Sequence, residues 1–458
     1  MNDNYFGLPA GIVGWIRQTV GAKPVRVEHR TGGGASREGA FVDLRYPDGH
    51  IRPCYLTYDL RPADASDRVV GVASEASAIA AVKAHGVEVP GMVAWSVEHQ
   101  AMLTDLVAGN PDFESLKLPA EREQVAADFM AQLAKLHAID PQTLPLQGFP
   151  ALAPPSTFIR ARLQALQSKH ARGVKDPLQV FVLRWLQDRV PTDPPRPVLV
   201  HGDAGPANFM HHQGKVSAML DWEMTHFGDP MEDVGWIAVR NLFLNFVPYP
   251  FLFEAYERAG GCKVDIDKVH FHRLYALATL IIDSHADLKQ NSGPFAGILG
   301  NNLNFYTVHI RAAVEGIAEA MGLPLPTLVL PERPFGSNDR SFNVVLEELR
   351  ALIVPRVQDP LAIHRLKSLA RVVKYWQQLD RYGAKFAQDE VTDIQAALGS
   401  HHADLAGARA ALVRAIEQRS LPDADIVRLL HRRVQRDNFV MAPAMGAFAN
   451  RRFIPLPV

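Results

Sequence analysis

Residues 198–223 read VLVHGDAGPANFMHHQGKVSAMLDWE, and this stretch decides the fold that we expect. It begins with a short apolar run, after which an acid, Asp203, and an amide, Asn208, stand five residues apart. A second apolar run then ends at another carboxylate, Asp221. Turns that follow strands present polar side chains at a cleft, while the strands fix their positions. We therefore expect Asp203, Asn208 and Asp221 to lie close together.

These three side chains are the groups that phosphoryl transfer requires. An acidic side chain must orient the attacking hydroxyl and accept its proton, and hard oxygen ligands must hold the Mg²⁺ that bridges the phosphates. Asp203 suits the first role, whereas Asn208 and Asp221 suit the second. A neutral amide among carboxylates also limits the negative charge that faces an anionic nucleotide. The sequence predicts ATP and Mg²⁺ as cofactors.

Other polar residues of the same region are expected to support the loop. Taken singly, even Asp203 could be a capping or turn residue, and only the joint pattern favours chemistry. We expect His201 to support the loop by hydrogen bonding, and Asp229 and Asp233 to cap the adjoining helix. For Glu223, support behind the metal and direct metal contact both stay open.

The whole pattern resembles a known family. His-Gly-Asp, an Asn five residues later, Asp221-Trp222-Glu223 and Gly228-Asp229-Pro230 are similar to the motifs of the aminoglycoside phosphotransferase family, which shares the bilobal fold of protein and choline kinases. The resemblance covers roughly residues 5–325. It implies an α+β fold with a small β-rich N-terminal lobe and a large helical C-terminal lobe. It also implies that Asp203 is the catalytic base and that Asn208 and Asp221 are the metal ligands.

Upstream, the resemblance implies a glycine-rich turn whose backbone N–H groups face phosphates. This turn would use Gly33, Gly34 and Ser36. Kinase-like folds normally pair a strand cation with a helix glutamate to hold the phosphates. Glu75 is the expected glutamate, but Thr57 stands where the cation belongs, so its partner is missing. Arg61, on the same strand face if extended structure continues, is the expected substitute.

Residues 101–109, AMLTDLVAG, resemble the hinge between the two lobes. By that alignment the carbonyl of Asp105 and the amide of Val107 would bond adenine, with Thr104 at the back of the pocket. The missing cation at Thr57 leaves an alternative, a pseudokinase that binds nucleotide without catalysis. A protein kinase is disfavoured because no Ala-Pro-Glu motif follows Asp221.

The acceptor is expected to be a small hydroxylated molecule. The basic run from Arg160 to Lys175 has few carboxylates, so it favours an anionic acceptor over a polycationic aminoglycoside, unless it is only a solvated helix face. The second lobe, in which Trp236 and Arg240 are expected to line the acceptor pocket, resembles the kinase-like domains fused to certain acyl-CoA dehydrogenases. That resemblance implies a hydroxyacyl-CoA as the substrate. An aminoglycoside or another small alcohol is the alternative.

Composition excludes several classes of partner. The chain has 458 residues and a formal net charge of −1, with no basic stripe that would bind nucleic acid. Its longest apolar stretches, such as residues 276–282, are far shorter than a membrane span, and no signal peptide is evident. Cys54 and Cys262 make neither a disulfide framework nor a metal-ligand spacing. We expect a cytoplasmic protein; the sequence leaves its oligomeric state open.

Proline clusters and a change of pattern divide the chain. We expect an N-terminal lobe over residues 1–107 and a C-terminal lobe, which carries the catalytic and metal site, over 108–325. A proline-rich linker over 326–340 then leads to a C-terminal all-α domain over 341–458. Within that last domain we expect breaks at Gly383 and Gly399.

Local patterns predict several elements of the two lobes. Two extended runs around Pro47-Asp48-Gly49 indicate a β-hairpin. Residues 74–85 are rich in alanine and indicate a helix that Ser74 could cap. A helix from Pro119 or Ala120 to about His137 is expected because its apolar residues recur at helical spacing, and the stretch over 158–190 is also expected to be helical.

Overall fold

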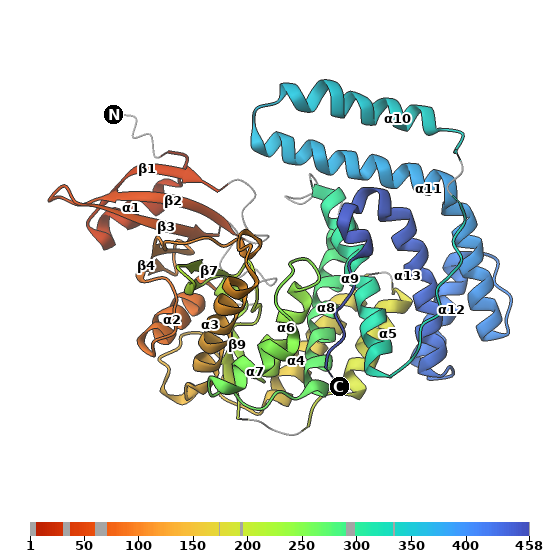
Figure 1. The fold of residues 1–458 in the computed structure, drawn as a ribbon, viewed down its shortest axis with the longest axis horizontal. Helices are drawn as coiled ribbons and strands as arrows, with labels where there is room; N and C mark the ends of the chain where they lie inside the picture. Colours follow the sequence, from red (N-terminus) through yellow and green to blue (C-terminus); the bar gives the residue numbers. More distant parts are fainter. Residues whose placement is uncertain are drawn as a thin grey trace. The chain divides into compact units, whose positions relative to one another are not determined.

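The computed structural model describes residues 6–30, 37–59, 71–173, 175–192, 196–289, 298–332 and 335–457 (Figure 1). They group into two compact units. The first comprises residues 1–158, 193–265 and 457–458, and the second comprises 159–192 and 266–456. This division differs from the domain boundaries that the sequence predicts, which stay a prediction.

A five-stranded sheet opens the first unit. Its strand order is β1-β2-β3-β5-β4, with every neighbouring pair antiparallel. The strands are β1 (Lys23–His29), β2 (Glu38–Arg45), β3 (Ile51–Tyr58), β4 (Met92–Ser96) and β5 (Ala101–Asp105). The predicted hairpin around Pro47-Asp48-Gly49 is confirmed, because β2 pairs with β3 from Glu38↔Tyr58 to Arg45↔Ile51. Helix α1 (Ala10–Val20) buries Ile12 and Ile16 in the same core as Leu44 and Leu56.

Two helices of the first unit follow the predicted positions. Helix α2 (Val72–Ala84) carries Glu75 in its first turn, where the side chain is buried. Ser74 does not cap this helix, since the N-cap residue is Gly71. Helix α3 (Pro119–Ala138) buries Val125, Phe129 and Leu133 at helical spacing, as the sequence predicts.

Two short antiparallel sheets carry the motif region. Strand β6 (Val198–Val200) pairs with β9 (His226–Gly228), and β7 (Phe209–His212) pairs with β8 (Lys215–Met219). All three residues of β6 are buried, which matches its unbroken apolar sequence. A single 3₁₀ turn, η3 (Trp222–Met224), joins β8 to β9. Helices α6 (Met231–Arg240) and α7 (Tyr249–Arg258) follow.

The described residues of the second unit form helices and connecting loops, with no strand. Its helices, the first of which begins just before the unit, are α4 (Pro155–Ala171), α5 (Pro177–Asp188), α8 (Ile266–Lys289), α9 (Leu299–Ala320), α10 (Asp339–Glu347), α11 (Pro360–Leu398), α12 (Leu405–Glu417) and α13 (Asp423–Met445). The stretch over 158–190 is helical, as the sequence predicts, but it forms two helices, since α4 ends at Ala171 and Pro177 starts α5. Gly383 does not break α11, whereas Gly399, with a φ of 63°, ends it.

A buried ion pair joins distant helices of this second unit. Asp176 caps α5 by accepting a bond from Leu178 N at 2.9 Å, and it also accepts two bonds from Arg433 of α13, at 2.9 and 2.7 Å. Burial alone would raise the pKa of Asp176, but the charge and hydrogen bonds of Arg433 hold it well below its ordinary value. No helix in the described part of the chain has both the length and the apolar character needed to cross a membrane.

Candidate active site

The loop that carries Asp203 begins where strand β6 ends. Gly202 has a φ of +84°, a conformation that side chains disfavour. A Cβ atom at this position would also lie 2.2 Å from the carbonyl oxygen of Met224, in the turn η3. Glycine is therefore required at the second position of the His-Gly-Asp sequence, because the loop passes directly against the turn that follows Asp221.

A buried carboxylate holds this loop in place. Asp233 of α6 accepts hydrogen bonds at 2.8 Å from the backbone N–H groups of both His201 and Gly202, and another at 3.0 Å from His137 Nε2. Tyr256 contacts the other ring nitrogen of His137 at 2.8 Å. Burial alone would raise the pKa of Asp233, but the bond and charge of His137, with the charge and backbone N–H of His201, lower it below its ordinary value.

Of the two nearby acids that are expected to cap α6, Asp229 and Asp233, only one does so. Asp229 does cap α6, since it accepts a bond from Met231 N at 2.9 Å. The capping role expected of Asp233 is wrong. Asp233 lies within the first turn of α6, and its carboxylate turns toward the loop amides instead of its own helix.

His201 supports the loop from inside, as the sequence predicts. Its Nε2 atom lies 2.8 Å from the carbonyl oxygen of Leu220, and its Nδ1 atom accepts a bond from Asp203 N at 3.3 Å. The ring therefore carries its proton on Nε2 and donates it to Leu220, and burial lowers its pKa. Leu220 N in turn donates to the carbonyl oxygen of Asn208 at 2.8 Å. These backbone bonds bring the end of β8, and with it Asp221, beside Asn208.

Asp203 lies at the centre of a hydrogen-bond network that leaves one position open. Arg240 of α6 donates from Nε to Oδ1 at 2.8 Å and from Nη2 to Oδ2. Asn208 Nδ2 donates to Oδ2 at 2.9 Å. A carboxylate has about four lone-pair positions, so these bonds leave one on Oδ1. The sequence predicts that Arg240 lines the acceptor pocket, but it does not reveal that Arg240 pairs with Asp203.

Asp221 occupies a strained position with a high concentration of negative charge. Its backbone is left-handed, with a φ of 65° and a ψ of 60°, which aspartate tolerates better than most residues. Burial raises the pKa of Asp221 to about 7, and the charges of Glu223 and Asp203 add to this effect, while Arg240 and Arg37 oppose it. Destabilised carboxylates of this kind are suited to a divalent cation.

The donor set fits Mg²⁺ held jointly with a nucleotide. Asn208 commits its amide nitrogen to Asp203, which leaves the amide oxygen as its metal-binding atom. In the described residues no three His, Cys, Asp or Glu side chains converge on a metal site of their own. Mg²⁺ typically uses one or two carboxylates together with phosphate oxygens and water, so a preformed cage is not needed.

Glu75 has the cationic partner that the sequence did not reveal. Arg37, directly before β2, forms an ion pair with Glu75, and the two side chains are 7% and 4% exposed. Arg37 Nε also lies 3.8 Å from the carboxylate of Glu223. The expectation that Glu75 lacks a partner is therefore wrong. The expected position of the cation is Thr57 on β3. The cation instead lies directly before the neighbouring strand β2, and Arg37 reaches Glu75 across 38 residues of sequence.

The structure describes only some of the other residues that are predicted to bind the nucleotide. Gly33, Gly34, Ser36 and Arg61 lie outside the described residues. Asp105 ends β5, and Val107 follows it by two residues, next to the hairpin of β7 and β8, where Ser217 Oγ donates to the carbonyl of Ala108 at 2.7 Å. The Asp105 carboxylate accepts a bond from Arg52 Nε at 2.8 Å. Adenine contacts at Asp105 and Val107 stay a prediction.

The anchor at Asp233 can be tested by stability. We expect Asp233→Asn to lower the free energy of unfolding by about 2–4 kcal/mol, because an amide nitrogen then faces buried donors. The difference from the wild type is present near neutral pH and disappears as the pH falls through the lowered pKa of Asp233. Urea denaturation measures both effects. Glu254→Gln, at an exposed ion pair, is the control and should change stability by less than about 0.5 kcal/mol. An equal effect of the two changes would contradict the anchor role.

Known proteins are similar to this chain over part of its length. Residues 50–275 match the model of the phosphotransferase enzyme family. Human acyl-CoA dehydrogenase family member 11 is 24% identical in a 243-residue alignment that covers 48% of this chain and 31% of that protein. Mouse acyl-CoA dehydrogenase family member 10 is 29% identical over 177 residues, which are 38% of this chain and 16% of that protein. The chain thus spans less than a third of these curated relatives.

Solved structures share the fold. A Ralstonia eutropha protein provisionally named as an aminoglycoside phosphotransferase is 20% identical with a TM-score of 0.51, covering 68% of this chain and 98% of its own. A thermostable mutant of aminoglycoside phosphotransferase APH(4)-Ia, in a complex with AMP-PNP and hygromycin B, is 17% identical with a TM-score of 0.50, covering 68% and 99%. These likenesses confirm the predicted α+β kinase-like fold. Over residues 50–275, which are just under half of its 458 residues, the chain is similar to the phosphotransferase enzyme family.

Proposed function

We propose that this chain transfers the γ-phosphoryl group of ATP to a hydroxyl of a small molecule, with Asp203 as the catalytic base. One observation carries the proposal. Asp203 is held by Arg240 and Asn208 so that Oδ1 keeps one lone-pair position for an incoming hydroxyl.

The residues then have separate roles in the reaction. The acceptor oxygen bonds to the γ-phosphorus as the bond to the β–γ bridging oxygen breaks, and the hydroxyl proton passes to Asp203 Oδ1. Asn208 and Asp221 would hold Mg²⁺, which would neutralise the negative charge of the phosphates. Arg240 keeps the Asp203 carboxylate oriented through its two bonds. For Glu223, a direct metal contact and support behind the metal both stay open.

The nucleotide would be held from the sheet side of the site. Arg37 supplies a cation beside Glu75 and Glu223, and its charge acts on Asp221, so it is placed to meet a phosphate. Gly33, Gly34 and Ser36 would add backbone N–H groups, and Asp105 and Val107 would bond adenine. We propose Arg37, and no longer Arg61, as the substitute for the usual strand lysine.

The base is tested by an isosteric change. We expect Asp203→Asn to lower the turnover number about 10³-fold, because the amide cannot accept the proton. Acceptor-dependent ADP formation measures this rate. Asp48→Asn, the same change at the exposed turn between β2 and β3, should leave the rate unchanged. If the wild-type chain binds ATP tightly but forms no ADP with any acceptor, the pseudokinase alternative replaces the proposal.

The role of Arg37 is tested against a matched arginine. Arg37→Ala should lower kcat/KM for ATP about 10- to 100-fold, the equivalent of one charge-assisted bond, and Arg37→Lys should recover part of it. Arg26→Ala, at an exposed ion pair on β1, should have no effect. Loss of ATP use in Arg61→Ala together with normal kinetics in Arg37→Ala would return the role to Arg61.

The acceptor we propose is a hydroxyacyl-CoA. Partial similarity to acyl-CoA dehydrogenase family members supports it, and Arg240 beside the base favours a polar or anionic acceptor over a polycation. The basic run over residues 160–175 gives less support for an anionic acceptor than its charge suggests. The reason is that Lys169 pairs with Asp283 and Lys175 pairs with Glu417. Hygromycin B in a structural relative keeps an aminoglycoside as the alternative.

A panel of acceptors decides between these classes. We expect ADP formation with 3-hydroxyacyl-CoA thioesters and none with the matching acyl-CoA thioesters, which lack the hydroxyl. Aminoglycosides, choline and homoserine complete the panel. Turnover with one of these and with no CoA thioester would remove the proposed substrate while leaving the phosphotransferase activity intact.

A further inference from the structure

A helical hairpin in the second unit is rich in apolar residues that the described chain does not cover. It consists of α10, a π-helical turn η5 (Glu348–Ile353) and the first half of α11, which lies beside α10 (Figure 1). Residues 340–367 include Phe342, Leu349 and Leu366, yet none of these 28 positions is buried against the described residues. Water-soluble helices normally bury one apolar face.

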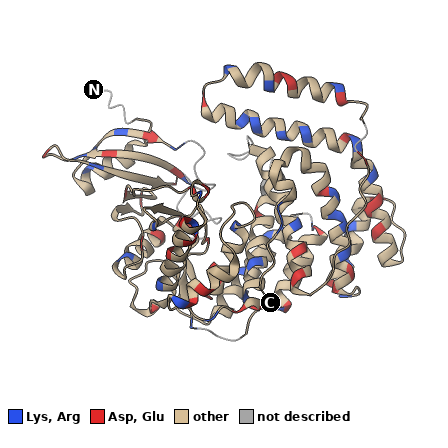
Figure 2. Cartoon of the chain, viewed as in Figure 1, with Lys and Arg blue, Asp and Glu red and all other residues tan. Residues whose placement is uncertain are grey.

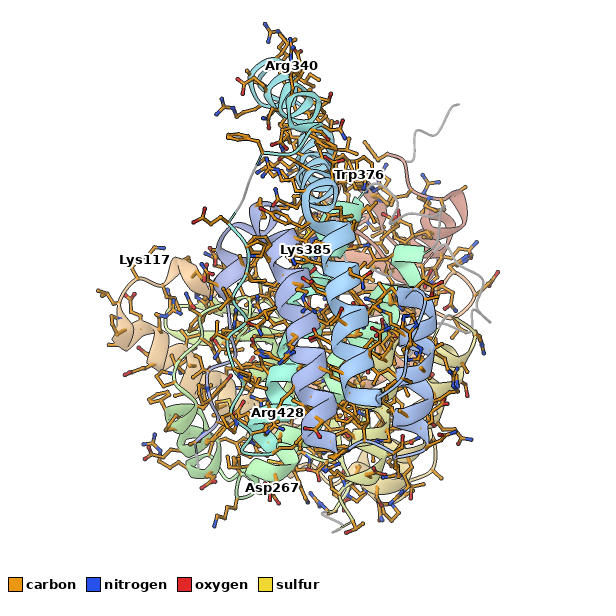
Figure 3. All side chains as sticks on the ribbon, turned by 90° about the vertical axis from the view of Figure 1, so that its right-hand side faces the viewer. Lys117, Asp267, Arg340, Trp376, Lys385 and Arg428 are labelled. Atoms are coloured by element: carbon orange, nitrogen blue, oxygen red, sulfur yellow. The ribbon has the colours of Figure 1, made fainter. Side chains whose placement is uncertain are left out.

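The large side chains of this hairpin are widely exposed. Their exposed fractions lie between 39% and 54% for Val344, Val345, Leu352, Ile353, Leu361, Leu369 and Trp376. Trp376 is labelled in Figure 3, on the upper part of α11. Clustered exposed apolar side chains on one element typically mark an interaction site.

The apolar positions have the spacing of helix–helix seams. On α11, Leu366, Leu369, Val373 and Trp376 follow one another at intervals of three, four and three residues. On α10 and η5, Val345, Leu349 and Leu352 repeat the same pattern. This heptad-like spacing produces a stripe that packs against another helix. The half-exposed stripes of the two helices can therefore receive further helices.

Side-chain hydrogen bonds hold the two helices of the hairpin together at the start of α10. Asp339 accepts bonds from Arg381 at 2.9 and 2.6 Å and from Gln377 at 3.1 Å, and it is itself buried. Gln377 also donates to Asn343 at 3.0 Å. A bidentate arginine pair of low exposure fixes direction as well as distance. The position of α10 against α11 is thus set before any partner arrives.

We propose that this hairpin is the interface with a second copy of the same chain, the two hairpins packing as an antiparallel four-helix bundle. In a twofold dimer each surface must complement itself, so α10 of one copy packs on α11 of the other. The charges fit this arrangement. Residues 360–379 of α11 carry Arg365, Lys367, Arg371 and Lys374 and no acid (Figure 2), so two α11 faces would repel each other. On α10 and η5, Arg340 and Arg350 offset Glu347 and Glu348, and Arg350 pairs with Glu347, so this nearly neutral face is the better partner for α11.

The available area matches a reversible dimer. At 1.5 Å per residue, the 15 residues of α10 and η5 extend about 22 Å, and two helices of about 10 Å width give a face of roughly 450 Å² in projection. Two such faces bury roughly 900 Å², which is below the roughly 1,200 Å² at which specific, stable interfaces begin and falls in the range of weak, transient ones. We therefore expect a dimer that dissociates on dilution.

Sedimentation velocity over a dilution series of the full chain tests the interface. The wild type should shift from dimer mass to monomer mass on dilution. The double variant Leu369→Glu/Trp376→Glu should be monomeric throughout, because each change puts a charge into the apolar seam. Leu118→Glu, at an equally exposed leucine of the first unit, is the matched control and should stay dimeric. Circular dichroism melting of each variant verifies folding.

Charge reversal gives a second test that leaves the apolar seam intact. Glu347→Lys/Glu348→Lys and Lys367→Glu/Lys374→Glu should each weaken the dimer, and a mixture of the two proteins should form a heterodimer. A wild type that stays monomeric at every concentration overturns the proposal, as does a dimer that survives the seam variant. Monomeric chain that binds phosphatidylcholine vesicles through Trp376 would assign the surface to a membrane and overturn it too.

Discussion

The site depends on a single buried carboxylate. Asp233 receives two backbone N–H groups of the loop that carries Asp203 and one side-chain N–H from His137. Without it, two loop amides would be buried with no acceptor, at a cost of about 1–3 kcal/mol each. Because Asp233 lies on α6, the same helix that presents Arg240, one rigid element sets both the path of the loop and the orientation of its acid.

Around this anchor, charges are arranged in pairs that a nucleotide can rearrange. Arg240 balances Asp203 on the acceptor side, and Arg37 lies between Glu75 and Glu223 on the other. Among the described residues Asp221 forms no such ion pair, and burial together with its acidic neighbours Glu223 and Asp203 raises its pKa. A site with one unbalanced carboxylate and a cation nearby has complementary places for a metal ion and for phosphate.

Local elements were predictable where one sequence pattern dominates. The Pro47-Asp48-Gly49 hairpin and helix α3 have strong turn or periodic signals, and both are confirmed. Predictions failed where two local signals compete. Ser74 is a good capping residue, but α2 begins earlier, at Val72. Gly383 is a weak helix former, yet tertiary packing along the long helix α11 carries the helix through it.

The sequence by itself determined which groups are available: an acid, an amide and a second acid at the ends of short strands, in the order of one enzyme family. Only the tertiary structure decided which charges meet. Arg37 reaches Glu75, and Arg240 reaches Asp203, across 38 and 37 residues of chain. No local pattern encodes such pairs, because they depend on how helices and strands pack together. The apolar stripes of α10 and α11 are equally visible in the sequence, but only the fold shows that they remain uncovered by the described residues.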